Sequence, residues 1–145
     1  MFSDVCTTSP NTTVQEAIKK MVEKKTNSLV VIDDDNKPIG ILSSHTVIRE
    51  ALPSYLEDSP VSANFGVEGT FNKYAVKVAD KSVMEIMHTD FHILSEDDAM
   101  IEAAAYSVGT HRRILPVADD DGKLIGAVTR TCIKNALFDV LYPKK

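Results

Sequence analysis

The sequence has few of the features that mark secreted or membrane-spanning proteins. It contains two cysteines, Cys6 and Cys132, too few for the disulfide framework of a small secreted domain. No stretch approaches the roughly 18 apolar residues of a membrane span, and no basic segment followed by an apolar run opens the chain. We therefore expect neither a membrane span nor a signal peptide. The cysteine usage favours a reducing, cytoplasmic setting.

The chain also lacks the patterns of common enzymes and nucleic-acid-binding proteins. Its net charge is −5, and no cluster of lysine and arginine outweighs the acids, which argues against binding a phosphate backbone. The GxGxxG, Walker, GxSxG and HExxH motifs are absent. We therefore expect no catalysis and no nucleic-acid partner. A small anionic ligand remains compatible with this composition, because it needs only a few local donors.

Three patterns that could suggest a metal site do not support one. The sequence contains no pair of CxxC units. His88 and His92 are four residues apart, which in an extended segment is about 13 Å, too far for two ligands of one ion. The acidic runs Asp33–Asp35 and Asp119–Asp121 lack the later ligands of a calcium loop. The sequence therefore predicts no metal centre, and the acidic runs are interpreted as hairpin turns.

The chain does contain an internal repeat. The segments DDDNKPIG (33–40) and DDDGKLIG (119–126) share six of eight residues at a constant offset of 86. At the same offset, residues 4–52 and 90–138 align without a gap. Such a duplication indicates a unit that buries its apolar face against its own copy.

Each copy shows the same order of elements: a helix, a strand, a turn, a returning strand and a second helix. Apolar residues at helical spacing and short β-branched runs carry this prediction. In the first copy these are Val14, Ala17, Ile18, Met21 and Val22, then the strands Ser28–Ile32 and Pro38–Leu42 around the turn Asp33–Lys37, then Val47, Ile48, Ala51 and Leu52. Thr12 and Gln15 predict a capping box for the first helix. In the second copy they are Met100, Ala103, Ala104 and Ser107, the strands Ile114–Ala118 and Leu124–Val128 around the turn Asp119–Lys123, and Ile133, Leu137, Val140 and Leu141.

These patterns divide the chain into a first repeat (1–53), a linker (54–82) and a second repeat (83–145). The linker is rich in Ser, Pro, Gly and acids from Ser54 to Thr70, which predicts a loop. A short helix is expected within Asn72–Met87, leading into the second copy.

The duplicated unit resembles the CBS domain family. The resemblance rests on Leu115-Pro-Val-Ala-Asp119, on the strand–helix junctions Gly40-Ile-Leu-Ser43 and Gly126-Ala-Val-Thr129, and on the stretch VMEIMHTDFHILSEDDAMIEAA. It implies an α/β (α+β) fold of two tandem β-α-β-β-α repeats, packed through their sheets with pseudo-two-fold symmetry. The two copies together would form one Bateman-type module.

The resemblance also implies a function. Such pairs are non-catalytic regulatory modules that bind AMP, ADP, ATP or S-adenosylmethionine in clefts between the repeats, and they regulate an attached or partner enzyme or transporter. No other cofactor is implied. The alternative is a ligand-free module for dimerisation or partner docking. Apolar residues of the second helices, Val47, Ile48, Leu137 and Leu141, need cover beyond a small sheet, which predicts a two-fold symmetric homodimer.

The family's motif indicates which residues would meet the ligand. Hydroxyls at the two junctions and donors before each strand would contact phosphate or adenine, although the same hydroxyls could serve only as helix N-caps and the arginines only as a solvated edge. The candidate ligand-binding residues are Asn27, Ser28, Ser43, His45, Thr46, Arg112, Arg113, Thr129, Thr131 and Cys132.

Both copies depart from the family at one position. The carboxylate that grips the ribose three residues after the junction hydroxyl is replaced by Thr46 and by Cys132. A neutral hydrogen bond is weaker than one to a charged group, so the loss could weaken ribose binding by about tenfold or more. Beside the usual adenosine mode, this departure leaves a different ligand, a rotated ligand or no ligand as alternatives.

Overall fold

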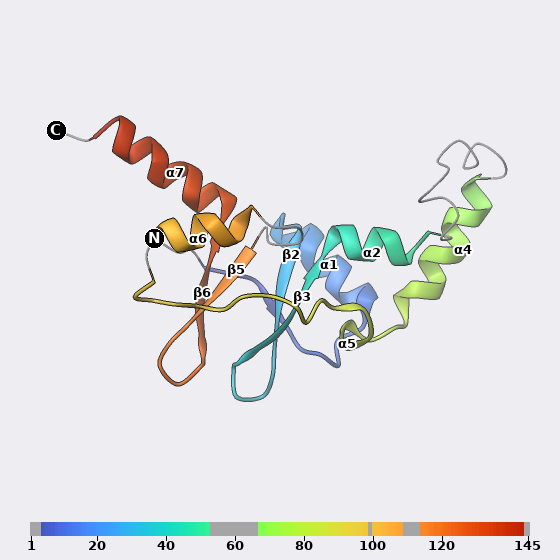
Figure 1. Ribbon diagram of the computed structural model, residues 1–145. Helices are drawn as coiled ribbons and strands as arrows, with labels where there is room; N and C mark the ends of the chain where they lie inside the picture. Colours follow the sequence, from blue (N-terminus) through green and yellow to red (C-terminus); the bar gives the residue numbers. More distant parts are fainter. Residues whose placement is uncertain (1–3, 53–66, 99, 109–113, 144–145) are drawn as a thin grey trace. The chain divides into compact units, whose positions relative to one another are not determined.

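The structure is a computed structural model that describes residues 4–52, 67–98, 100–108 and 114–143 (Figure 1). The chain divides into two compact units. The first-repeat unit comprises Cys6–Val31 and Ile41–His88, and the second-repeat unit comprises Met1–Val5, Ile32–Gly40 and Thr89–Lys145. The hairpin loop of the first repeat therefore belongs to the second-repeat unit.

The first sheet has the strand order β1-β2-β3, with β1 spanning Thr7–Thr8, β2 Ser28–Ile32 and β3 Pro38–Ser43. Strand β1 runs parallel to β2, and Thr8 lies opposite Val31. The predicted strand at 28–32 is confirmed, and the returning strand extends one residue further than predicted. These strands form because their apolar run is buried on both faces, which β-branched residues suit.

Four helices of the first-repeat unit are described: α1 (Val14–Lys24), α2 (Ser44–Glu50), α4 (Val67–Ala79) and α5 (Val83–Ile86). The predicted cap at Thr12 is wrong by one residue, since the side chain of Thr13 accepts the hydrogen bond from the Glu16 N–H. Thr12 is held in the preceding segment, where its carbonyl accepts from the N–H of Val83 at 2.8 Å.

The predicted loop between Ser54 and Thr70 is also partly wrong, because α4 already begins at Val67; residues 53–66 lie outside the described part. Helix α4 contacts α1, and its Val78 is buried. Packing of this kind commonly overrides the weak helix propensity of Gly and Thr.

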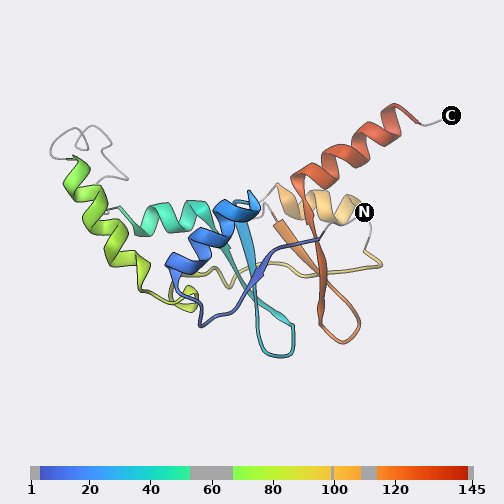
Figure 2. The same ribbon diagram turned by 180° about the vertical axis from the view of Figure 1, so that it is seen from behind.

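The second sheet has the order β4-β5-β6, with β4 at Leu94–Ser95, β5 at Ile114–Ala118 and β6 at Leu124–Thr129. Leu94 lies opposite Val117, so the register matches that of the first sheet at the sequence offset of 86. Helices α6 (Met100–Ser107) and α7 (Arg130–Leu141) complete the repeat, and their C-terminal and N-terminal ends respectively adjoin the sheet (Figures 1 and 2). The core consists of Leu94, Ala103, Leu115, Val117 and Val128.

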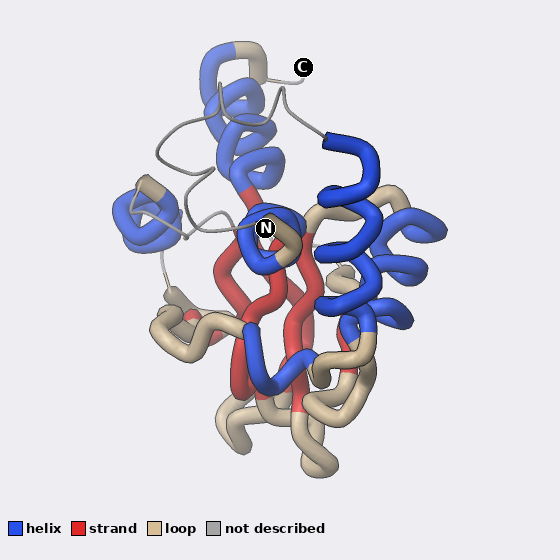
Figure 3. The backbone as a smooth tube through the Cα atoms, turned by 90° about the vertical axis from the view of Figure 1, so that its right-hand side faces the viewer, coloured by secondary structure: helices blue, strands red, loops and turns tan. Residues whose placement is uncertain are grey.

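The two acidic runs form matching hairpin turns, as predicted. One carboxylate oxygen of Asp33 accepts from the N–H groups of Asp35 and Lys37, both at 2.9 Å. Asp119 makes the equivalent bonds to Asp121 and Lys123, both at 3.0 Å. The two hairpin loops lie next to each other at the foot of the strands (Figure 3). The first acid of each run is thus committed to turn formation.

One hairpin loop is fastened to the other by Asn36, which has a left-handed φ of 64°. Its carbonyl accepts from the Leu124 N–H at 2.9 Å, and its side-chain Nδ2 donates to the Leu124 carbonyl at 3.2 Å. The symmetry-related contact cannot form, because the equivalent positions hold Gly122, which has no amide side chain, and Pro38, which has no N–H. This loop clasp is therefore asymmetric within a symmetric repeat.

In the ranges given above, no helix is long and apolar enough to cross a membrane. Within the same ranges, no group of three or more His, Cys, Asp or Glu side chains is arranged to hold a metal ion.

Candidate functional site

The first strand–helix junction is organised by Ser43, where β3 ends and α2 begins. Ser43 is extended, and its Oγ accepts from the Thr46 N–H at 3.2 Å, which makes it the N-cap of α2. The same Oγ lies 3.1 Å from the Thr46 hydroxyl. The predicted site residues Ser43 and Thr46 are therefore brought together.

The Thr46 hydroxyl is directed into the protein rather than toward solvent. Thr46 is 1% exposed, and its Oγ1 lies 2.6 Å from Nε2 of His88. His88 is held in place by a reciprocal backbone pair with Ile41, at 2.9 and 2.8 Å. A hydroxyl has one proton to donate and two lone pairs. In this junction cluster of Ser43, Thr46 and His88, most of that capacity is already used.

Sequence reasoning missed the role of His88. It considered the residue only as a metal ligand, and nothing in the local pattern connects positions 42 residues apart. The available signal was its place two residues after the short helix α5 (Val83–Ile86), near the start of the second repeat. A polar side chain at that place could be expected to form a hydrogen bond with another segment of the unit.

Of the two predicted residues at the start of β2, Asn27 contacts the first junction and Ser28, among the described residues, does not. The Ser44 N–H donates to the carbonyl of Asn27 at 2.9 Å, and Ser44 Oγ donates to its Oδ1 at 3.3 Å. Ser28 is half-buried, and its N–H donates to Thr26 Oγ1 at 3.4 Å. His45 is exposed on α2. Asn27 therefore ties the start of α2 to the start of β2.

The second junction has the same cap but a more open interior. Thr129 Oγ1 accepts from the Cys132 N–H and lies 3.3 Å from Cys132 Sγ. Cys132 is half-buried, unlike its counterpart in the first repeat, and Thr131 is exposed. Arg130, at the first position of α7, donates from Nη2 to the Ser107 carbonyl at 3.3 Å. The two junctions therefore share a geometry and differ in how tightly they are closed.

The predicted arginines, Arg112 and Arg113, lie outside the described residues. They directly precede Ile114, which is paired in the sheet with Thr129. His92, considered with His88 as a metal ligand, instead stacks on Tyr106 with ring centroids 3.7 Å apart.

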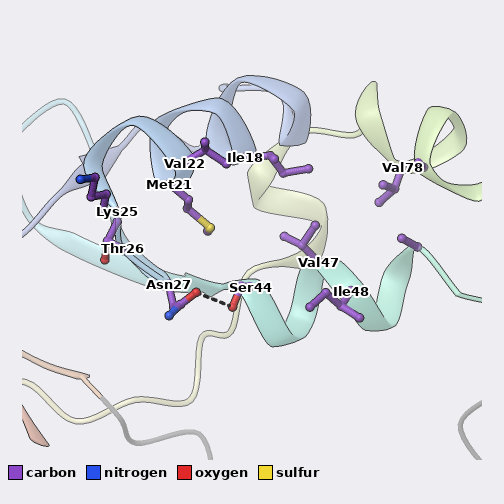
Figure 4. Close-up of a pocket in the computed structure, with 12 residues that line it drawn as sticks. Ile18, Met21, Val22, Lys25, Thr26, Asn27, Ser44, Val47, Ile48 and Val78 are labelled. Atoms are coloured by element: carbon purple, nitrogen blue, oxygen red, sulfur yellow. Dashed lines mark hydrogen bonds between the residues drawn. The ribbon is translucent and has the colours of Figure 1, made fainter. Parts of the chain in front are cut away.

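The first-repeat unit also contains an apolar groove of about 430 Å³ between α1, α2 and α4, which sequence reasoning did not predict (Figure 4). Met21 of α1 and Val47 of α2 point toward each other across it, and Val78 faces them from α4. Polar groups lie at one end, where α1 runs into β2. The groove is lined by Ile18, Met21, Val22, Lys25, Thr26, Asn27, Ser44, Val47, Ile48, Ala51, Ala75 and Val78.

Part of the apolar stripe predicted for the first helix is not buried, because it lines the groove. Met21 is in the core, whereas Val22 is 72% exposed on the groove side. The expectation that Val47 needs an external cover is wrong, since it is 7% exposed within its own unit. Ile48 remains 59% exposed and forms the rim of the groove.

A second cavity, of about 360 Å³, occupies the corresponding place in the second-repeat unit. Its lining residues are Ser107, Val108, Arg130 and Ile133, which the offset of 86 relates to Met21, Val22, Ser44 and Val47. The cavity of the second repeat has the more polar lining, because Arg130 stands at the position of Ser44 and Ser107 at the position of Met21.

Comparison with known proteins decides the family. The model of the CBS domain matches residues 1–53 and 83–139, which is more than half of the chain. This chain belongs to the CBS domain family. The likeness covers both repeats and omits the segment between them. The α+β architecture described above is therefore a tandem CBS fold.

Plant proteins provide the most informative comparison for this CBS pair. It is 32% identical over 145 aligned positions to the chloroplastic CBS domain-containing protein CBSX1 of Arabidopsis thaliana, covering 94% of this chain and 61% of CBSX1. The crystal structure of CBSX2 from Arabidopsis thaliana superposes with a TM-score of 0.78 at 26% identity, covering 97% of this chain and 90% of that one. CBSX2 in complex with AMP superposes with a TM-score of 0.69 at 28% identity, covering 94% and 90%. The chain spans about three-fifths of the length of curated CBSX1.

Proposed function

We propose that this CBS pair is a non-catalytic regulatory module that binds an adenosine-containing ligand: AMP, ADP, ATP or S-adenosylmethionine. The carrying observation is the second junction, where the Thr129 hydroxyl and the N-terminus of α7 stand at the end of β6. Free N–H groups and the positive end of the helix dipole suit a phosphate. The solved complex of the related CBSX2 with AMP supports an adenosine ligand.

The second junction is the better candidate for the ribose. At the first junction, the Thr46 hydroxyl is buried and bonded to His88, so a ligand would have to break that bond before using it. Cys132 is half-buried and bonded to Thr129 through sulfur, which is a weak acceptor. Arg112 and Arg113, which lie outside the described residues, remain candidate phosphate donors on the strength of the sequence.

Calorimetric titration of the full chain with adenosine, AMP, ADP, ATP and S-adenosylmethionine tests the proposal. Cys132→Asp is expected to tighten binding about tenfold, because a charged ribose contact replaces a weak one. Thr46→Asp is the matched control, and its carboxylate is expected to pair with His88 and leave affinity unchanged. Arg113→Glu should weaken ADP and ATP more than adenosine. If no compound binds at millimolar concentration, the adenosine proposal is wrong.

A ligand-free docking or dimerisation module is the second candidate. The observation in its favour is the neutral residue at both ribose positions, Thr46 and Cys132. The same titration separates the two candidates. A ligand-free module predicts that the parent chain binds none of the compounds and that Cys132→Asp does not raise the affinity for them.

In either case we propose that the chain forms a homodimer. Large apolar side chains on the second helices are exposed, with Ile48 at 59%, Leu137 at 61% and Leu141 at 71%. Large apolar side chains exposed on a helix commonly mark an interaction site. Sedimentation equilibrium at micromolar concentration should give twice the chain mass of 15.9 kDa. A mass of one chain at that concentration contradicts this part of the proposal.

A further inference from the structure

The groove of the first-repeat unit has the size and lining of a small-molecule site. Its volume of about 430 Å³ falls within the range of roughly 300–1,000 Å³ that is typical of such sites. Eight of its twelve lining residues are apolar, and α1, α2 and α4 each supply part of the wall. Ligand sites combine a mostly apolar wall of this kind with a few placed polar groups.

The polar lining residues gather at one end of the groove (Figure 4), and they are Lys25, Thr26, Asn27 and Ser44. Hydrogen-bond acceptors at this end are already used. The Met21 carbonyl accepts from the Thr26 N–H at 3.0 Å, and the Asn27 carbonyl accepts from the Ser44 N–H at 2.9 Å. The side-chain Oδ1 of Asn27 accepts from the Ser44 hydroxyl at 3.3 Å. A ligand therefore finds few acceptors there.

Donors at the same end remain available. Within the described residues, neither the Lys25 ammonium nor the amide nitrogen of the Asn27 side chain makes a hydrogen bond or an ion pair. No acidic side chain is among the described residues that line the groove. An ammonium group and an amide NH₂ only donate. This end of the groove therefore suits a negatively charged acceptor, such as a carboxylate.

The backbone at Lys25 supports a role for its side chain. Lys25 is the C-cap of α1 and has a left-handed φ of 54°. Glycine is the residue that this conformation favours at the end of a helix. A bulkier residue held in a sparsely populated conformation is an argument that its side chain has a role. For Lys25, the groove beside it supplies that role.

The volume of the groove limits the size of the ligand. One water molecule takes up about 30 Å³ in the liquid, so the groove holds roughly ten to fifteen non-hydrogen atoms. An unbranched carboxylate of about eight to ten carbon atoms has this size. A nucleotide is larger and is polar over most of its surface, so the apolar wall does not suit it.

We propose that the groove binds a small amphipathic carboxylate. The hydrocarbon chain lies between α1, α2 and α4, and the carboxylate lies at Lys25 and Asn27. All of the lining residues belong to the first-repeat unit, so the site is complete within that unit. It is separate from the second junction, where the adenosine ligand is proposed to bind, and it depends neither on that ligand nor on the homodimer.

Calorimetric titration of the full chain with three compounds tests the proposal. Octanoate is expected to bind with a Kd of about 0.1 mM, which is typical for a ligand of this size. Butanoate lacks four methylene groups, each worth about fourfold in affinity, and should bind about 200-fold more weakly. Octan-1-ol keeps the chain and lacks the charge, so it should bind about tenfold more weakly than octanoate.

Two variants separate the head group from the chain. Lys25→Met removes the ammonium and should raise the Kd of octanoate about tenfold, with no change for octan-1-ol. Lys24→Met is the matched control, because Lys24 is exposed on α1 outside the groove lining, and it should change neither. Ala75→Leu fills the wall of the groove and should abolish binding of both compounds. Circular dichroism confirms the fold of each variant.

Several results overturn the proposal. The first is an absence of binding at about 5 mM octanoate, well above the expected Kd. Equal weakening by Lys24→Met and Lys25→Met shows attraction to general charge, and undiminished binding by Ala75→Leu places the ligand elsewhere. Displacement of octanoate by AMP shows that both compounds use the adenosine site. An affinity that falls as the chain concentration rises shows that a second copy is the occupant of the groove.

Discussion

The hydrogen bond between Thr46 and His88 can be tested by removing the hydroxyl while keeping the shape of the side chain. Thr46→Val does this, because the two residues differ by a hydroxyl in place of a methyl group. In the parent the hydroxyl is 1% exposed, 2.6 Å from His88 Nε2 and 3.1 Å from Ser43 Oγ. The substitution leaves the backbone bond from residue 46 to Ser43 in place.

The expected loss of stability follows from the burial of the two partners. A net hydrogen bond contributes about 1 kcal/mol, and a fully buried group that loses its partner costs about 1–3 kcal/mol. His88 is half-buried, so water can compensate part of its loss. We expect Thr46→Val to lower the free energy of unfolding by about 1–2 kcal/mol, which for a chain of this length is a fall of roughly 3–8 °C in Tm.

A double-mutant cycle in urea isolates the contact from the other effects of each substitution. Thr46→Val and His88→Ala are measured singly and together, and we expect a coupling energy of about 1 kcal/mol. Cys132→Val, at the equivalent half-buried position of the second repeat, is the control and should change stability by less than about 1 kcal/mol. A coupling energy near zero would refute the reasoning, because the two side chains would then not depend on each other.

The sequence determined most of the regular structure because its signals there were local. The strands at 28–32 and 114–118 are short β-branched runs next to turn residues, and both were predicted to the residue. The matching octets predicted the two hairpin turns, and the structure shows the same aspartate bonds in both. Residues that form hydrogen bonds with each other within five positions of the chain leave a recognisable sequence pattern.

The site was less predictable because its contacts are distant in the sequence. Thr46 was expected to face a ribose, yet it is bonded to His88 in another segment of the first-repeat unit. The groove depends on α4, whose start falls in a segment predicted to be loop. The repeat offset located the two junctions. It could not reveal that Thr46 is buried at the first junction whereas Cys132 is half-buried at the second. That difference comes from tertiary packing and not from the motif itself.

The loop clasp gives two further predictions, both measured by urea unfolding. Asn36→Ala should destabilise the chain by about 1–2 kcal/mol, because it removes the amide bond to Leu124 and places a side chain that disfavours positive φ at 64°; Asn36→Gly, which accepts that φ, should lose less. Gly122 has a φ of 83°, and a Cβ there would meet Lys37 Cε at an ordinary 3.7 Å. Gly122→Ala should therefore cost about 1 kcal/mol through backbone strain rather than through a clash. Asn enters the left-handed region more readily than Ala, so Gly122→Asn should cost less even though its side chain is larger. If the larger side chain is instead the more destabilising, then crowding at the loop, and not backbone strain, selects glycine at this position.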